Sequence, residues 1–342
     1  MFKDLKGIDK GREERIRKSN LDLLLDRSDV LTDHIVRELK AAESLPDSEE
    51  LFMETLLKTY EHTKKELDDV RFTEDDLRSY LFATANQDQQ EMKLLAYCLY
   101  TGNLLNILME RNKQENKKTR FYLNGLGEKM DGVFAFASKI NEIYLENLAG
   151  GGICSAAGCF RGNANIMIAK NIKGSALFAG IGSYNGNANL IIAKDIEGDE
   201  LMGDINETGG MNSIGLVIAH DVKGDYIFQN IGQAGKIGMI IAKNIQGILD
   251  FKNEKLAESA KIIAGINIAE EPDTFIKRYP KETRTYTGKE TKKYLAEYRI
   301  NEINTLVESM DGKTPEEVFD IAEKIQEIYN SIKEKCLKTS KE

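Results

Sequence analysis

The chain has 342 residues, of which 41% are hydrophobic and 30% charged, and its formal net charge at neutral pH is −9. This composition is typical of a globular protein of two or three domains, and the acidic balance argues against a general nucleic-acid or acidic-membrane binder. The highly charged start does not resemble a signal peptide, and no apolar run is long enough to cross a bilayer. The four scattered cysteines, with no Cys-X2-Cys pair, favour reduced thiols and a cytoplasmic location.

Residues 1–118 are expected to form an α-helical domain. Apolar residues recur there at helical spacing, beginning with Leu21, Leu24, Leu25, Leu31, Ile35, Val36 and Leu39. Asp47 with Glu50 has the pattern of a capping box, and Thr73 is suited to cap a further short helix. A second apolar stripe is interrupted by Gly102, which is a weak point for a helix.

Five stretches in the middle of the chain align with one another on their last glycine. They read EIYLENLAG (142–150), IMIAKNIKG (166–174), LIIAKDIEG (190–198), LVIAHDVKG (216–224) and MIIAKNIQG (239–247). Successive glycines are 24, 24, 26 and 23 residues apart. A repeat of this period indicates stacked supersecondary units, each packed against its neighbours.

The repeat predicts an α+β protein built on a central parallel β-solenoid, or β-helix. The units are too short for the two helices of a helical repeat, whereas their β-branched residues suit two or three short strands separated by bends. We expect five to six coils of about 24 residues within residues 119–270. RFYLNGLG (120–127) is a partial first rung and KIIAGINIAE (261–270) a degenerate last one.

The rest of the chain is expected to be helical again. Residues 271–288 contain two prolines and are interpreted as a linker, and 289–342 as an αα-hairpin. Its first helix is expected from about Glu290 to Met310. Its second helix should follow a capping box, supplied by Thr314, Pro315 and Glu317.

Stacked coils turn equivalent positions into columns about 4.8 Å apart. One column, three positions before the glycine, is expected to form an amide ladder at a corner, because Asn and Asp tolerate left-handed backbone. It contains Asn147, Asn171, Asp195, Asp221 and Asn244. Two identical GNAN segments, 162–165 and 186–189, indicate a second corner.

The strands that read IMIA, LIIA, LVIA and MIIA are apolar at consecutive positions, so both of their faces should be buried. The pairs Leu177–Phe178 and Leu201–Met202 predict the same for a second strand. One face points into the coil, and the other needs a cover from the flanking helices or from a partner subunit. Our hypothesis is that the helical segments pack along this wall. Because helical sequence adjoins both ends of the array, a capped particle is expected rather than a filament.

A row of potentially basic side chains lies four positions before the glycine. Its members are Lys170, Lys194, His220 and Lys243. One interpretation is an anion-binding strip for a phosphate, a nucleotide or an acidic partner. The alternative is a solvated face neutralised by acids such as Glu197 and Asp199.

Other candidates for chemistry have simpler interpretations. Asp199 and Asp225 should stack on adjacent rungs, where paired carboxylates would suit glycoside cleavage or a cation, but turn acids facing solvent explain them equally. Cys154 and Cys159 fit buried positions better than a redox pair. The sequence separation of His34 and His62 shows no metal-ligand pattern. We therefore assign no catalytic residue, metal site or cofactor.

The preferred function is a non-enzymatic scaffold or interaction protein that associates with itself or with a protein partner. The first alternative is an enzyme or binding protein acting on a polysaccharide or anionic ligand along the solenoid face. The second is RNA binding through residues 277–299, which interleave basic residues with tyrosines, although the acidic whole makes nucleic acid an unfavoured partner.

Overall fold

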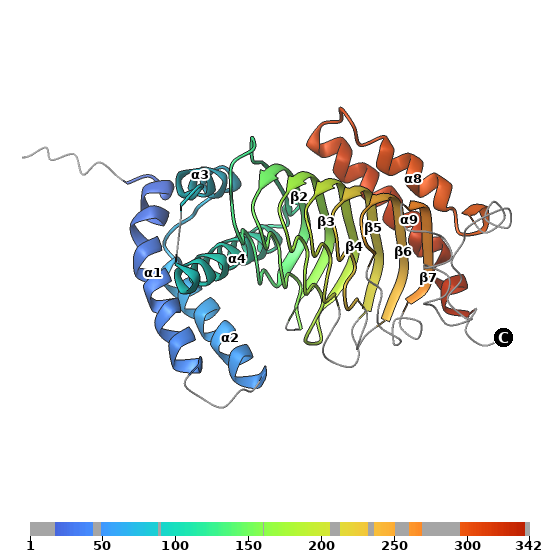
Figure 1. Ribbon diagram of the computed structural model, residues 1–342. Helices are drawn as coiled ribbons and strands as arrows, with labels where there is room; N and C mark the ends of the chain where they lie inside the picture. Colours follow the sequence, from blue (N-terminus) through green and yellow to red (C-terminus); the bar gives the residue numbers. More distant parts are fainter. Residues whose placement is uncertain are drawn as a thin grey trace, which may run out of the picture.

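The computed structural model describes residues 18–43, 49–87, 90–159, 161–205, 213–231, 236–249, 260–268 and 295–338. Helices at the N-terminal end lead into a solenoid, and two helices near the C-terminus lie along its side (Figure 1). The N-terminal helices are α1 (Asn20–Glu43), α2 (Glu49–Glu66), α3 (Glu74–Thr84) and α4 (Glu91–Gln114). The C-terminal helices are α8 (Ile300–Glu308) and α9 (Pro315–Lys338), which together are called the hairpin below.

The described strands form one parallel sheet in which each pairs with the next along the chain, which confirms the predicted β-solenoid of roughly five turns flanked by helices. The strands are β1 (Arg120–Asn124), β2 (Lys139–Ala149), β3 (Asn163–Lys173), β4 (Asn187–Glu197), β5 (Ser213–Lys223), β6 (Lys236–Gln246) and β7 (Ala260–Ile268). The register advances by one repeat per rung, and the partial first rung and the degenerate last rung are the strands β1 and β7.

The Asn/Asp column bends every long strand. Its five members have φ between 52° and 56°, a left-handed conformation that Asn and Asp tolerate better than other side chains. Amides also bond from rung to rung: Asn171 Nδ2 donates to Asn147 Oδ1 at 2.5 Å, and Asn244 Nδ2 donates to Asp221 Oδ1 at 2.7 Å. The column therefore both shapes the strand and ties neighbouring rungs together.

The other side of each coil differs from the sequence expectation. No second strand forms between Gly174 and Gly186, where described residues make turns instead. Phe178 has φ +58°, and the equivalent Met202 has φ +52°. A left-handed residue redirects the chain, so Leu177 and Phe178 both point into the coil interior rather than to opposite faces. The prediction of an outward apolar face at these pairs was wrong.

The long strands, in contrast, are buried on both faces as predicted. Met167 and Ala169 of β3 lie in the coil interior, in a core that continues into the N-terminal helices. Ile166 and Ile168 lie in a separate cluster with Val307, Phe319 and other apolar residues of the hairpin. The hypothesis that helices cover the wall is thus confirmed, and the cover is the hairpin. Its helix α9 contacts β2 and β4 through β7 (Figure 1).

The N-terminal helices cover the first rung and supply hydrogen bonds to its free edge. Arg78 of α3 donates to the backbone oxygen of Tyr122 at 2.9 Å. Thr101 and Asn106 of α4 accept from the backbone N–H groups of Phe134 (3.1 Å) and Lys139 (2.9 Å). Satisfying these groups removes a template for strand addition at this end.

The predicted helix starts can be compared one by one. The capping box at Thr73 and the one at Thr314 both form. The Asp47–Glu50 box includes a residue outside the described ranges. A short helical turn at residues 295–297 precedes the hairpin, and Arg299 with φ +52° separates this turn from α8. The expected helix start near Glu290 lies outside the described residues. The whole of the proposed linker, 271–288, lies outside the described residues.

Glycine stacks on glycine at the end of each strand. A Cβ on Gly174 would lie 2.0 Å from the backbone oxygen of Gly150, whereas a Cβ on Gly127 would meet nothing within 4 Å. Both residues have positive φ, at +151° and +86°. Comparing substitutions at the two positions therefore distinguishes the cost of the close backbone contact, which only Gly174 makes, from the cost of the backbone conformation.

We expect Gly174→Ala to lower the free energy of unfolding by more than about 2 kcal/mol, because backbone of the neighbouring rung must move. Gly127→Ala should cost only about 1 kcal/mol, from its left-handed backbone alone. Urea unfolding followed by circular dichroism measures both, and equal losses would contradict the close stacking.

Candidate functional site

The wall between the solenoid and the hairpin contains the predicted basic row. The register places Lys170, Lys194, His220 and Lys243 side by side on successive strands. The side chains of Lys194 and His220 are only 3% and 2% exposed, and the two outer lysines are 17% exposed. The row is therefore neither an open strip nor a solvated face, because the hairpin covers it.

Two acids at the tip of the hairpin meet this row. Asp311 lies 2.9 Å from the Nζ atoms of both Lys170 and Lys194. Glu308 forms an ion pair with Lys243, and its carboxylate lies 3.6 Å from Nε2 of His220. Four groups of one solenoid column are thus matched by two carboxylates from one turn of chain more than sixty residues away.

These ion pairs shift the pKa values of the groups that form them. Burial alone would lower the pKa of Lys194, but its bonds to Asp195 and Asp311 outweigh burial and raise it. Burial opposes ionisation of Asp311, yet the two lysines lower its pKa below the usual range. The bond to Lys243 lowers the pKa of Glu308. Both partners of this interface are therefore held in their charged forms.

His220 is the buried centre of the row. Its Nδ1 lies 2.7 Å from Oδ2 of Asp221, the neighbouring ladder residue. Its Nε2 is buried and makes no hydrogen bond, since Glu308 stands slightly too far away. The ladder and the basic row, which the sequence treats as separate columns, are thus joined by side-chain contacts.

A second set of ion pairs joins the hairpin to the first rung, and no sequence pattern predicts it. Arg120 of β1, whose side chain is 9% exposed, bonds Glu142 at 2.5 Å. The same guanidinium reaches Glu316, Asp320 and Glu323 of α9 at 2.9–3.1 Å. Partners on α9 lie almost two hundred residues away, so no local pattern marks this contact.

The other candidates from the sequence have structural partners as well. Asp199 and Asp225 are exposed, and each accepts a backbone N–H from the following rung, Asp225 at 2.8 Å and Ile248 at 3.1 Å. Cys154 and Cys159 are free and buried in the coil, and burial raises their pKa values. Thiols held in the protonated form are poor nucleophiles.

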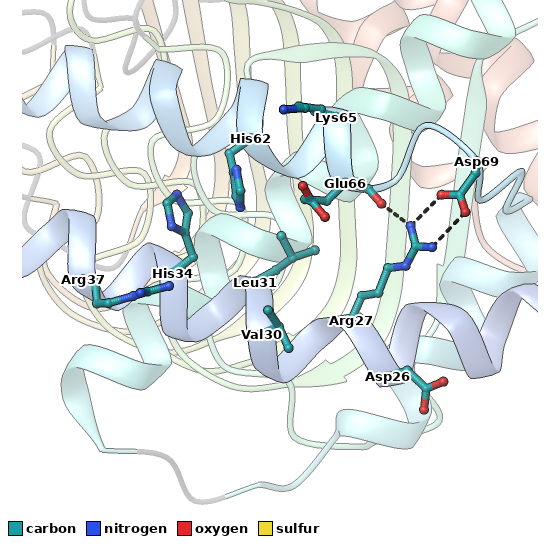
Figure 2. A pocket seen from close by; sticks show the side chains of 10 residues that line it. All are labelled: Asp26, Arg27, Val30, Leu31, His34, Arg37, His62, Lys65, Glu66 and Asp69. Atoms are coloured by element: carbon teal, nitrogen blue, oxygen red, sulfur yellow. Dashed lines mark hydrogen bonds and ion pairs between the residues drawn. The ribbon is translucent and has the colours of Figure 1, made fainter.

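A groove between α1 and α2, with a volume of about 620 Å³, is a site that the sequence analysis missed. Its most distinctive pair is His34 on α1 and His62 on α2, whose ring centroids are 3.8 Å apart (Figure 2). The sequence separation of the two histidines does not indicate this contact, which arises because α1 packs against α2. Burial, followed by the nearby His62, lowers the pKa of His34.

One end of the groove is fixed by an ion pair. The guanidinium of Arg27 donates to the two carboxylate oxygens of Asp69 at 2.6 and 2.9 Å, and also to the backbone oxygen of Glu66 (Figure 2). Bidentate geometry of this kind holds a side chain in one orientation. Arg37 and Lys65 also line the groove, so its wall carries both signs of charge.

Comparison with models of protein families, with curated proteins and with solved structures found no match. Among the described residues, no helix is both long and apolar enough to span a membrane.

The ion pairs of Asp311 make the stability of the interface depend on pH. Because its pKa is lowered in the folded protein, this carboxylate stabilises the fold fully above its ordinary range. That contribution is lost as the pH falls through the ordinary value toward the folded one. We expect Asp311→Asn to cost about 1 kcal/mol at pH 7, since the side chain is half-exposed and screened.

Between about pH 5 and pH 3, the wild-type protein should lose more stability than Asp311→Asn, so that the two unfolding curves converge. Urea unfolding over this pH series measures the difference. Asp33→Asn, an exposed change on α1, is the control and should run parallel to the wild type. Parallel behaviour of Asp311→Asn as well would contradict the role of its charge.

Proposed function

We propose that this protein is a non-enzymatic interaction scaffold in which the solenoid is a rigid body between two helical elements. The observation that supports this proposal most is that the aligned charged side chains bond to other groups of the same chain. The basic row bonds to Glu308 and Asp311, and Asp199 and Asp225 bond to backbone of the next rung. These groups therefore stabilise the fold. In an enzyme, charged groups of the active site would instead be directed at a substrate.

The two alternative functions, ligand binding along the solenoid face and RNA binding, are less well supported by the described contacts. Binding of a polysaccharide or anionic ligand along Lys170, Lys194, His220 and Lys243 requires the hairpin to leave the wall, which would expose a large apolar cluster. RNA binding through residues 277–299 rests on a segment of which only 295–299 are among the described residues. A cytoplasmic location accords with the three free, buried thiols of Cys98, Cys154 and Cys159.

Self-association is part of the proposal, and the two ends of the sheet suggest its form. Side chains of α3 and α4 bond to backbone groups of β1 and of the turn after it, whereas β7 is the last strand of the sheet in the described residues. Backbone groups at a strand edge favour pairing with another strand. A partner at β7 with a capped β1 gives a closed dimer rather than an open filament.

The mass in solution tests this proposal. Light scattering should give twice the 38.5 kDa of one chain, at concentrations where the dimer persists. A single mass of one chain across the full concentration range would remove self-association from the proposal.

Cross-linking locates the contact. In a Cys336→Ser background, Asn267→Cys on β7 should give cross-linked dimers with a short bismaleimide. Asn171→Cys, an exposed ladder position with the same φ of 52° on β3, is the matched control and should stay monomeric on denaturing gels. Equal cross-linking of the two variants would place the contact elsewhere.

A further inference from the structure

A pocket of about 270 Å³ lies between the solenoid and the hairpin, beside the first residues of β4, β5 and β6. Residues of these three strands form one side of it, and residues of α9 form the other. It is separate from the basic row, which is bonded to Glu308 and Asp311 at the tip of the hairpin. Its volume is just below the range of pockets for drug-sized ligands, so it suits a smaller molecule.

The pocket begins where a second column of amides ends. Asn165 and Asn189 are equivalent residues of β3 and β4, and Nδ2 of Asn189 donates to Oδ1 of Asn165 at 2.9 Å. On the next two rungs, the register places Gly215 and Gly238 at this position. A glycine has no amide with which to continue the column. Oδ1 of Asn189, whose side chain lines the pocket, therefore remains an acceptor without a donor from the next rung.

Helix α9 occupies the space that the glycines leave. A Cβ on Gly238 would lie 1.8 Å from Oη of Tyr329, and a Cβ on Gly215 would lie 3.1 Å from Cε1 of the same ring. One turn earlier on α9, Gln326 is held by the amide column, because its Nε2 donates to Oδ1 of Asn165 at 3.0 Å. The pocket is thus preformed, since packing and hydrogen bonds hold its aromatic and amide side chains in place.

The charge of the pocket is positive. Lys236 at the start of β6 and Lys333 of α9 line it, and no acidic residue does so among the described residues. Neither lysine forms an ion pair with another described residue, in contrast to the lysines of the basic row. Two ammonium groups without a neighbouring acid attract an anion, even though the whole chain carries a net charge of −9.

We propose that this pocket binds a small polyhydroxylated anion, either a sugar phosphate or a sugar acid. Lys236 and Lys333 bond the phosphate or carboxylate group, because hydrogen bonds between charged partners are the strongest available to a side chain. The acceptor of Asn189 bonds a hydroxyl group of the ligand. The volume of about 270 Å³ suits one sugar unit rather than a polysaccharide chain or a nucleotide.

This binding site goes beyond the proposed scaffold function, because it gives the contact between solenoid and hairpin a ligand. The ligand touches β6 through Lys236 and α9 through Lys333. A molecule that binds only the folded protein stabilises it, and one that binds across two elements stabilises their contact in particular. The melting temperature should therefore rise with ligand concentration.

The test is isothermal titration calorimetry of the full-length protein with glucose 6-phosphate, glucuronate, glucose and inorganic phosphate. We expect one saturable site for glucose 6-phosphate or glucuronate, and the tighter of the two identifies the anionic group. Glucose and phosphate should bind more weakly, because each makes only part of the contacts. Absence of saturable binding of all four compounds at millimolar concentration would overturn the proposal.

Variants assign the binding to this pocket. Lys236→Gln and Lys333→Gln should each weaken it at least about fivefold, because each removes a charged hydrogen bond. Lys324→Gln is the matched control and should bind as the wild type does. Lys324 is an exposed lysine of the same helix, nine residues and therefore half a rotation away from Lys333. Equal weakening by all three changes would indicate attraction by the overall charge and would contradict a site.

A measurement on the wild type covers the case in which a variant fails to fold. On addition of the tighter compound, the backbone amide NMR signals of Gly215 and Gly238 and the side-chain amide signal of Gln326 should shift. The signal of Gly127, near the first rung, should stay unchanged. Shifts confined to residues outside the pocket would place the binding elsewhere and overturn the proposal.

Discussion

The strands of this solenoid are apolar on both faces, and one core cannot bury them. Met167 and its equivalents fill the coil, while Ile166 and Ile168 point outward and need a second layer. The hairpin supplies that layer, so two separate apolar clusters share one sheet. Burial of an apolar side chain contributes about 1.5–3 kcal/mol, and a row of such residues along five rungs makes the cover an integral part of the fold. The ion pairs at its tip fix where it lies.

The need to cover the outward apolar face also explains the ion pairs between the solenoid and the hairpin. A lysine or histidine beside an outward apolar face is removed from water once the face is covered, and a buried charge needs a partner. Asp311 and Glu308 meet that need for four groups of the row. Arg120 does the same at the first rung, with acids of α9. The interface thus combines non-directional burial with a few directional contacts that set the register of the hairpin.

Much of the solenoid could be predicted because its contacts repeat at a fixed sequence interval. Aligning Asn147 with Asn171 in sequence also aligns them in space, since parallel strands pair one repeat apart. The turn segments were harder, because Leu177 and Phe178 look like strand residues until the left-handed backbone at Phe178 is known. The contacts of Asp311 with Lys194, and of His34 with His62, join different elements that are not related by the repeat. Sequence periodicity does not predict such pairs, because only the packing of the helices brings them together.

The glycine column limits how such an array can change in length. Each glycine from Gly174 to Gly247 has the backbone oxygen of the preceding one within about 2 Å of where a side chain would begin. The strand and the corner of each coil therefore keep a fixed distance from those of the next coil. The glycines are nevertheless 23 to 26 residues apart in sequence. The difference falls in the segments between one corner and the next strand. An insertion there leaves the stack intact, whereas one inside a strand would shift every column beyond it. Whole coils and turn segments are therefore the units by which this molecule can be lengthened, shortened or re-engineered.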